Sequence, residues 1–199
     1  MKTKHRVKPI VAVNPWILLI GFMAVATITQ PASAGTQTFS IDPYGVHLDG
    51  GTTAAGSFGS GGIILPSSGQ SAFSFGFVIP NDYLADSPIR IVLSWHAPVT
   101  GCNFALLPNF VDRTRPNHLP STGNASGGLD PANSSNILTA PATSNLGKKK
   151  QYLLTPNQGF DQQPGDAILL GFFRRPGSFG DNCADNLVIP GITIRYQTP

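Results

Sequence analysis

Glutamate is absent from this 199-residue sequence, so all ten of its acidic residues are aspartates. Charged residues make up only 12% of the chain, whereas glycine and proline number 22 and 18. Long surface helices are usually built from Glu, Lys and Ala, and both glycine and proline disfavour helix interiors. No segment shows a sustained apolar recurrence at three and four residues. The composition therefore excludes a protein built from long exposed helices.

Recognised catalytic signatures are also missing from the sequence. It contains no Gly-x-Ser-x-Gly elbow, no His-Glu-x-x-His motif and no Cys-x-x-Cys pair. Beyond the first 34 residues the histidines are His47, His96 and His118, and each is isolated along the chain. We therefore assign no catalytic residue and expect no organic cofactor.

The first 34 residues have the three-part layout of a secretory signal peptide. Four basic residues lie within the first eight positions, residues 16–26 form an apolar stretch, and Ala32-Ser33-Ala34 matches a cleavage site. We expect cleavage after Ala34, which leaves residues 35–199 as one mature domain. The alternative is an uncleaved membrane anchor, because the twenty residues 10–29 are mostly apolar and about long enough to cross a bilayer.

Cleavage changes the charge of the protein. It removes four of the 13 basic residues and none of the ten acidic ones, so the mature chain has a net charge near −1. A nucleic-acid partner loses its electrostatic basis, and no membrane attachment is expected once the leader is gone. The predicted location is therefore secreted or periplasmic.

Cysteine is scarce, with only Cys102 and Cys183 in the chain. An even number of cysteines in an oxidising compartment predicts one disulfide. Closing a loop of about 80 residues would stabilise the fold by roughly 4 kcal/mol in the chain-entropy model. The alternative is a pair of unbonded, buried thiols.

Apolar residues occur in short runs separated by clusters of Gly, Pro, Asn, Asp and Ser, which is typical of strands joined by turns. The runs predict strands at residues 63–65, 72–79, 89–96, 102–107, 137–139, 150–155, 167–174 and 192–196. Alternation within 89–96 places Trp95 in the core, and residues 113–146 form a long polar connection. We predict an all-β domain, an antiparallel two-sheet β-sandwich with jelly-roll-like connectivity.

Two C-terminal segments share a recognisable strand pattern. Pro164-Gly165-Asp166 leads into an apolar strand that ends at Arg174, and Gly191 begins an alternating strand that ends at Tyr196. This arrangement resembles the C-terminal β-sandwich domains of phage tail and virion-associated proteins. The resemblance implies a sandwich fold and a tendency toward assembly or surface attachment, and it carries over no catalytic residue. The predicted signal peptide and the two cysteines depart from that family.

One loop concentrates oxygen ligands. It contains Asp181 and Asp185, together with Asn182 and Asn186, and hard cations such as calcium prefer such oxygens. Asp181 and Asp185 are therefore candidate calcium ligands. The alternative is that these residues only shape turns, as Asp and Asn do widely.

These observations favour an exported, non-catalytic β-sandwich that serves as a binding or structural module of the cell surface or periplasm, with a glycan or protein partner. Rigid sandwiches commonly display binding loops, and residues 113–146 suit that role. One alternative is a secreted hydrolase whose site combines His96, His118 and an aspartate. Another is a subunit of a homo-oligomeric extracellular assembly.

Overall fold

The computed structural model describes residues 34–55, 61–114, 121–124, 129–131, 136–155 and 162–199. The predicted signal peptide thus lies outside the described residues, except for Ala34. Within the described ranges, no helix has the length and hydrophobicity needed to span a membrane.

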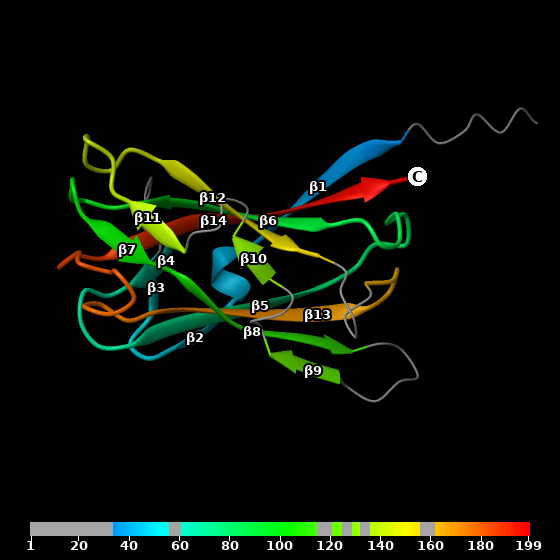
Figure 1. The fold of residues 1–199 in the computed structure, drawn as a ribbon, viewed down its shortest axis with the longest axis horizontal. Helices are drawn as coiled ribbons and strands as arrows, with labels where there is room; N and C mark the ends of the chain where they lie inside the picture. Colours follow the sequence, from blue (N-terminus) through cyan, green and yellow to red (C-terminus); the bar gives the residue numbers. More distant parts are fainter. Residues whose placement is uncertain (1–33, 56–60, 115–120, 125–128, 132–135, 156–161) are drawn as a thin grey trace, which may run out of the picture. The chain divides into compact units, whose positions relative to one another are not determined.

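The described residues form β-strands with a single short 3-10 turn (Figure 1). The elements are β1 (Gly35–Ile41), η1 (Pro43–Gly45), β2 (His47–Asp49), β3 (Thr53–Ala55), β4 (Gly62–Leu65), β5 (Ser71–Val78), β6 (Ile89–His96), β7 (Asn103–Ala105), β8 (Leu107–Thr114), β9 (Ser121–Asn124), β10 (Leu129–Pro131), β11 (Ile137–Thr139), β12 (Lys148–Leu154), β13 (Ala167–Arg174) and β14 (Leu187–Thr198).

Two antiparallel sheets build the sandwich. One sheet has the order β10-β12-β6-β14-β4-β3, and β1 pairs with the remaining length of β14; the other has the order β2-β5-β13-β8-β9. Figure 1 shows these sheets as two layers, with β6, β12 and β14 in one and β5, β8 and β13 in the other. Along the order β4, β5, β6, β8, β9, β12, β13 and β14, the chain changes layer at every step except the one from β8 to β9. As a result, β4-β14-β6-β12 faces β5-β13-β8-β9. This is jelly-roll connectivity, and it confirms the predicted fold class.

The core lies between the two sheets, and strand alternation determines which side chains enter it. Ile89, Ile91, Leu93 and Trp95 are all buried, as the period-two pattern of this segment predicts. From the facing sheet, Phe73, Phe75 and Phe172 stack with ring centroids 5.4–6.3 Å apart. Aromatic rings therefore fill much of the space between β5 and β13 and the opposite layer.

The observed strands extend the predicted set. The segments 89–96, 137–139 and 167–174 have the predicted bounds, whereas the last strand begins at Leu187 and the segment 102–107 is divided between β7 and β8. Sequence analysis missed the short strands β1, β2, β3, β9 and β10, of which β9 and β10 lie within the polar segment 113–146. Most of these strands lie at or near sheet edges and are largely polar, so they lack the apolar alternation that identifies a strand.

A buried ion pair connects the two layers at one end of the sandwich. The Arg174 side chain is fully buried, and its Nε donates to Oδ2 of Asp181 at 2.8 Å while its Nη2 donates to Oδ1 at 3.3 Å. The other guanidinium donors bind backbone carbonyls of Leu65, Pro66, Cys183 and Asp185 at 2.7–3.1 Å. Every edge of the guanidinium therefore has an acceptor, which is the condition under which a charge can be buried.

The predicted disulfide between Cys102 and Cys183 is present, with Cα atoms 5.3 Å apart, and it lies beside this ion pair. Asp181 also accepts from the backbone N–H groups of Ala105 and Cys183. The covalent bond and the ion pair thus fasten the same loop to β7. A disulfide fits a compartment in which thiols are oxidised.

The Asp181→Asn variant should lower the free energy of unfolding by about 3–5 kcal/mol, because the substitution leaves the buried Arg174 charge without its counter-charge. Urea unfolding followed by Trp95 fluorescence measures the difference. Asp86→Asn is the matched control, since Asp86 is exposed and its φ of 63° suits asparagine. Equal stability of the two variants would contradict the role assigned to the ion pair.

Alkaline pH should destabilise the fold through buried tyrosines. Burial raises the pKa of Tyr152, whose hydroxyl donates to the Leu106 carbonyl at 2.7 Å, and burial is also the main cause of the raised pKa of Tyr83. The unfolded chain ionises its tyrosines near pH 10, so the stabilisation is complete below that pH and is lost as pH rises above it.

Tyr152→Phe tests this pH dependence. At pH 7 the variant should be about 1 kcal/mol less stable than the wild type, because the Leu106 carbonyl loses its donor. Between about pH 10 and 11 its free energy of unfolding should fall less steeply, because one linked tyrosine is gone. Urea unfolding at a series of pH values measures both quantities, and identical slopes would contradict the linkage to Tyr152.

Candidate functional site

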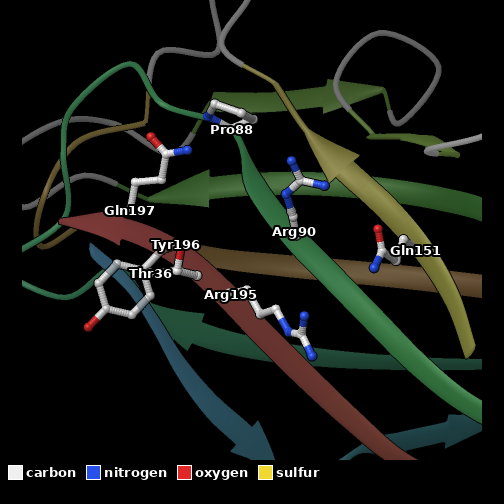
Figure 2. Close-up of a pocket in the computed structure, with 7 residues that line it drawn as sticks. All are labelled: Thr36, Pro88, Arg90, Gln151, Arg195, Tyr196 and Gln197. Carbon is white, nitrogen blue, oxygen red and sulfur yellow. The ribbon is translucent and has the colours of Figure 1, made fainter. Parts of the chain in front are cut away.

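A groove of about 240 Å³ opens on the sheet that contains β6, β12 and β14 (Figure 2). We call it the outer groove and define it by the residues that line it. These residues are Thr36, Pro88, Arg90, Gln151, Arg195, Tyr196 and Gln197. They come from β1, β6, β12 and β14 and from the residue that precedes β6, so segments distant in sequence build one site.

Strand alternation explains why the polar lining residues face outward. On β14, Ile192, Ile194 and Tyr196 are buried, while Arg195 and Gln197 between and after them are more exposed. On β6, Arg90 is exposed between the buried side chains of Ile89 and Ile91. The groove therefore lies on the outer face of the sheet, opposite the core.

The loop between β5 and β6 forms one wall of the outer groove and is fixed to the end of β14. The backbone N–H of Leu84 donates to the Gln197 carbonyl at 2.8 Å. The Tyr196 hydroxyl donates to Oδ1 of Asp82 at 3.0 Å. Burial and the neighbouring Asp82 carboxylate raise the pKa of Tyr196. These two bonds hold the middle of the loop against β14, and Pro88 directly precedes β6, so Pro88 stays close to the groove.

Two arginines occupy directly opposed positions on neighbouring strands. Arg195 of β14 pairs in register with Arg90 of β6, and directly opposite side chains on one face have Cβ atoms about 4.5–5.5 Å apart. Among the side chains that the structure describes, no carboxylate forms an ion pair with either arginine. Like charges placed in this way destabilise a sheet, so the pair is an electrostatic cost to the unliganded fold.

One donor in the outer groove lacks a partner. The Nε–H of Arg195 is buried and has no hydrogen-bond acceptor among the described residues. Buried donors in native proteins are nearly always satisfied, and an exception calls for a specific explanation.

The described lining of the outer groove is rich in hydrogen-bond donors. It supplies guanidinium groups from Arg90 and Arg195, side-chain amides from Gln151 and Gln197, and one hydroxyl from Thr36. Among these described residues there is no carboxylate, imidazole or thiol. Donors outnumber acceptors, so the groove suits a ligand rich in oxygen acceptors.

The predicted calcium ligands lie elsewhere, in the loop after β13. Both carboxylate oxygens of Asp181 accept hydrogen bonds from Arg174, and Oδ1 of Asp185 accepts from the backbone N–H of Asn186 at 2.7 Å. Within the described ranges, no group of three or more His, Cys, Asp or Glu side chains is placed to hold a metal ion. Calcium binding at Asp181 and Asp185 stays a prediction.

The two histidines that the structure describes beyond residue 34 lie in different sheets. His47 lies on β2 of the five-stranded sheet and is exposed, whereas His96 lies at the end of β6 in the other sheet. His118 lies outside the described residues. The proposed combination of His96 and His118 therefore stays a prediction.

Sequence analysis missed the outer groove, although it placed both arginines correctly on strands. In the sequence Arg90 lies between Ile89 and Ile91, and Arg195 lies between Ile194 and Tyr196, so strand alternation places both arginines opposite the core. The missing information was that β6 and β14 are neighbours with these two residues in register. Such non-local pairing leaves no local signal.

Arg90→Gln should raise the free energy of unfolding by about 0.2–1 kcal/mol at low ionic strength, because it relieves the repulsion from Arg195. The gain should shrink at 1 M NaCl, where the Debye length is only about 3 Å. Arg175→Gln, at an exposed arginine just beyond β13, is the control for removing one positive charge. The repulsion is disproved if Arg90→Gln is no more stable than this control in urea unfolding.

Comparisons with known proteins found similarity among solved structures alone. No protein-family model matches the sequence, and no curated protein matches it. Among solved structures it is similar to TmCBM61 in complex with β-1,4-galactotriose, with a TM-score of 0.30 and 9% identity over 81% of this chain and 86% of that chain.

It is also similar to the enzymatically active domain of tailspike protein 4 of bacteriophage CBA120, with a TM-score of 0.30 and 9% identity. That match covers 84% of this chain but only 19% of the tailspike chain. At this TM-score, neither likeness carries an argument about function.

Proposed function

We propose that this protein is an exported, non-catalytic binding module of the cell surface or periplasm, and that it binds a saccharide in the outer groove. The observation that carries the proposal is the groove itself, where polar donors from four strands lie on one face of a sheet and the described lining residues include no Asp, Glu, His, Cys or Lys. Amide, hydroxyl and guanidinium groups are suited to the dense hydroxyl and ring oxygens of sugars.

The size of the outer groove supports binding of part of a larger ligand. Its volume of about 240 Å³ falls below the roughly 300–1,000 Å³ of pockets that enclose a drug-sized molecule. We therefore expect the groove to hold one unit of a longer chain, with the neighbouring units lying on the surface of the sheet.

The two alternatives remain open and are tested separately. A hydrolase would need His96, His118 and an aspartate to act together, so replacing both histidines without loss of a detected activity would exclude that site. Homo-oligomeric assembly finds a candidate surface in Val78 and Leu169, which are 60% and 40% exposed on neighbouring strands of the five-stranded sheet. Light scattering of the purified protein measures its oligomeric state.

The proposed function predicts that a glycan array probed with the processed protein gives a specific hit that depends on the outer groove. The double variant Gln151→Ala, Gln197→Ala should bind this glycan about tenfold more weakly, because each lost neutral hydrogen bond contributes about 0.5–1.5 kcal/mol. Titration calorimetry with the soluble glycan measures the ratio.

Gln70→Ala is the matched control for that experiment, since Gln70 is an exposed glutamine outside the groove, just before β5. This variant should bind as the wild type does. A hit whose affinity is unchanged in the groove variant would place the binding site elsewhere, and an array without specific hits would remove the saccharide.

A further inference from the structure

We propose that the sugar unit held in the outer groove carries a carboxylate, so that the ligand is an acidic saccharide built from uronic-acid-type residues. This inference rests on the proposed function and adds the charge of the ligand. Its carrying observation is the in-register pair Arg90 and Arg195, two cations opposed on one face without a described counter-ion.

The electrostatic repulsion between Arg90 and Arg195 is explained if a bound anion completes the site. An opposed pair of cations destabilises the unliganded sheet, and the buried Nε–H of Arg195 has no acceptor among the described residues. A ligand carboxylate bound by the two arginines would neutralise the repulsion. The Arg174–Asp181 pair shows the same chemistry complete within this fold, with Nε and Nη2 both bound to one carboxylate.

A carboxylate fits the donors better than other anions do. The guanidinium group is a planar fork that binds the two oxygens of a carboxylate side by side. Arg90 and Arg195 each bring such a group to the lining of the outer groove. The amides of Gln151 and Gln197 then remain for the hydroxyl groups of the same sugar ring.

A saccharide fits the remaining surface better than an acidic peptide does. Peptides and proteins usually bind through large apolar or aromatic anchors that fill a desolvated pocket. Among the described residues that line the outer groove, Pro88 is the one apolar side chain on the outer face, because the Tyr196 side chain is buried and its hydroxyl is bound to Asp82. The rest of the lining is polar and lies on an open sheet face.

The test compares an oligouronate with the same oligosaccharide after methyl esterification of its carboxyl groups. The two probes share ring, length and hydroxyl groups and differ in charge. Titration calorimetry with the processed protein should give at least tenfold tighter binding of the oligouronate, and this affinity should fall with added NaCl.

Variants of the two arginines locate the effect. Arg90→Gln and Arg195→Gln should each weaken binding of the oligouronate about tenfold or more and should leave the weak binding of the ester nearly unchanged. Arg195→Lys keeps the charge but lacks the fork, so it should recover only part of the affinity. Arg175→Gln, at an exposed site beyond β13, should bind as the wild type does.

Four other results would overturn the inference, and they can be told apart. Equal affinity for the acid and its ester leaves the saccharide function intact and removes the carboxylate. Binding of a sulfated oligosaccharide but not of the oligouronate assigns a tetrahedral anion instead. Binding of an acidic peptide in preference to both sugars replaces the saccharide. Oligouronate binding that is unchanged in both Arg90→Gln and Arg195→Gln places the anion outside the outer groove.

Discussion

The buried pair of Arg174 and Asp181 is the interaction on which the architecture of this domain most depends. Arg174 ends β13, and its guanidinium donates to the carbonyls at the end of β4 and to the Cys183 carbonyl in the loop after β13. It also binds the Asp181 carboxylate, which in turn accepts from the backbone of β7. The guanidinium carbon Cζ also lies 4.7 Å from the centre of the Phe104 ring. A single side chain thus satisfies loop carbonyls that would otherwise be buried without donors. The disulfide at Cys183 closes the same region covalently, so a loop without regular structure acquires one defined conformation.

Local pattern was sufficient to predict the strands that fill the core. Ile89, Ile91 and Trp95 alternate with polar residues, so their segment was recognisable, and the Pro164-Gly165-Asp166 turn is confirmed by a φ of 85° at Gly165. The short edge strands could not be predicted, because β1 is mostly polar and owes its structure to pairing with β14. The same limitation applies to the outer groove. The sequence indicated that Arg90 and Arg195 face away from the core, but only the sheet order brings them together.

The contrast between two kinds of arginine links stability to the proposed function. Arg174 is enclosed by acceptors and stabilises the fold. Arg90 and Arg195, in contrast, lie opposite each other on a surface where the described residues offer no counter-charge. Natural proteins retain locally unfavourable arrangements mainly where a ligand needs them. The sheet makes such an arrangement possible, because strand pairing places the backbone positions of the two arginines directly opposite each other before a ligand binds.

The pairing of β14 has a consequence for how the protein is made. This strand lies between β6 on one side and β4 and β1 on the other, yet it is synthesised after every other described strand. Until it emerges, the two halves of its sheet have no common partner, and their facing edges and apolar surfaces stay open. A nascent chain of this topology cannot close its sandwich early. It therefore depends on protection from self-association until its central strand is complete, and a translational pause before β14 would prolong that vulnerable interval.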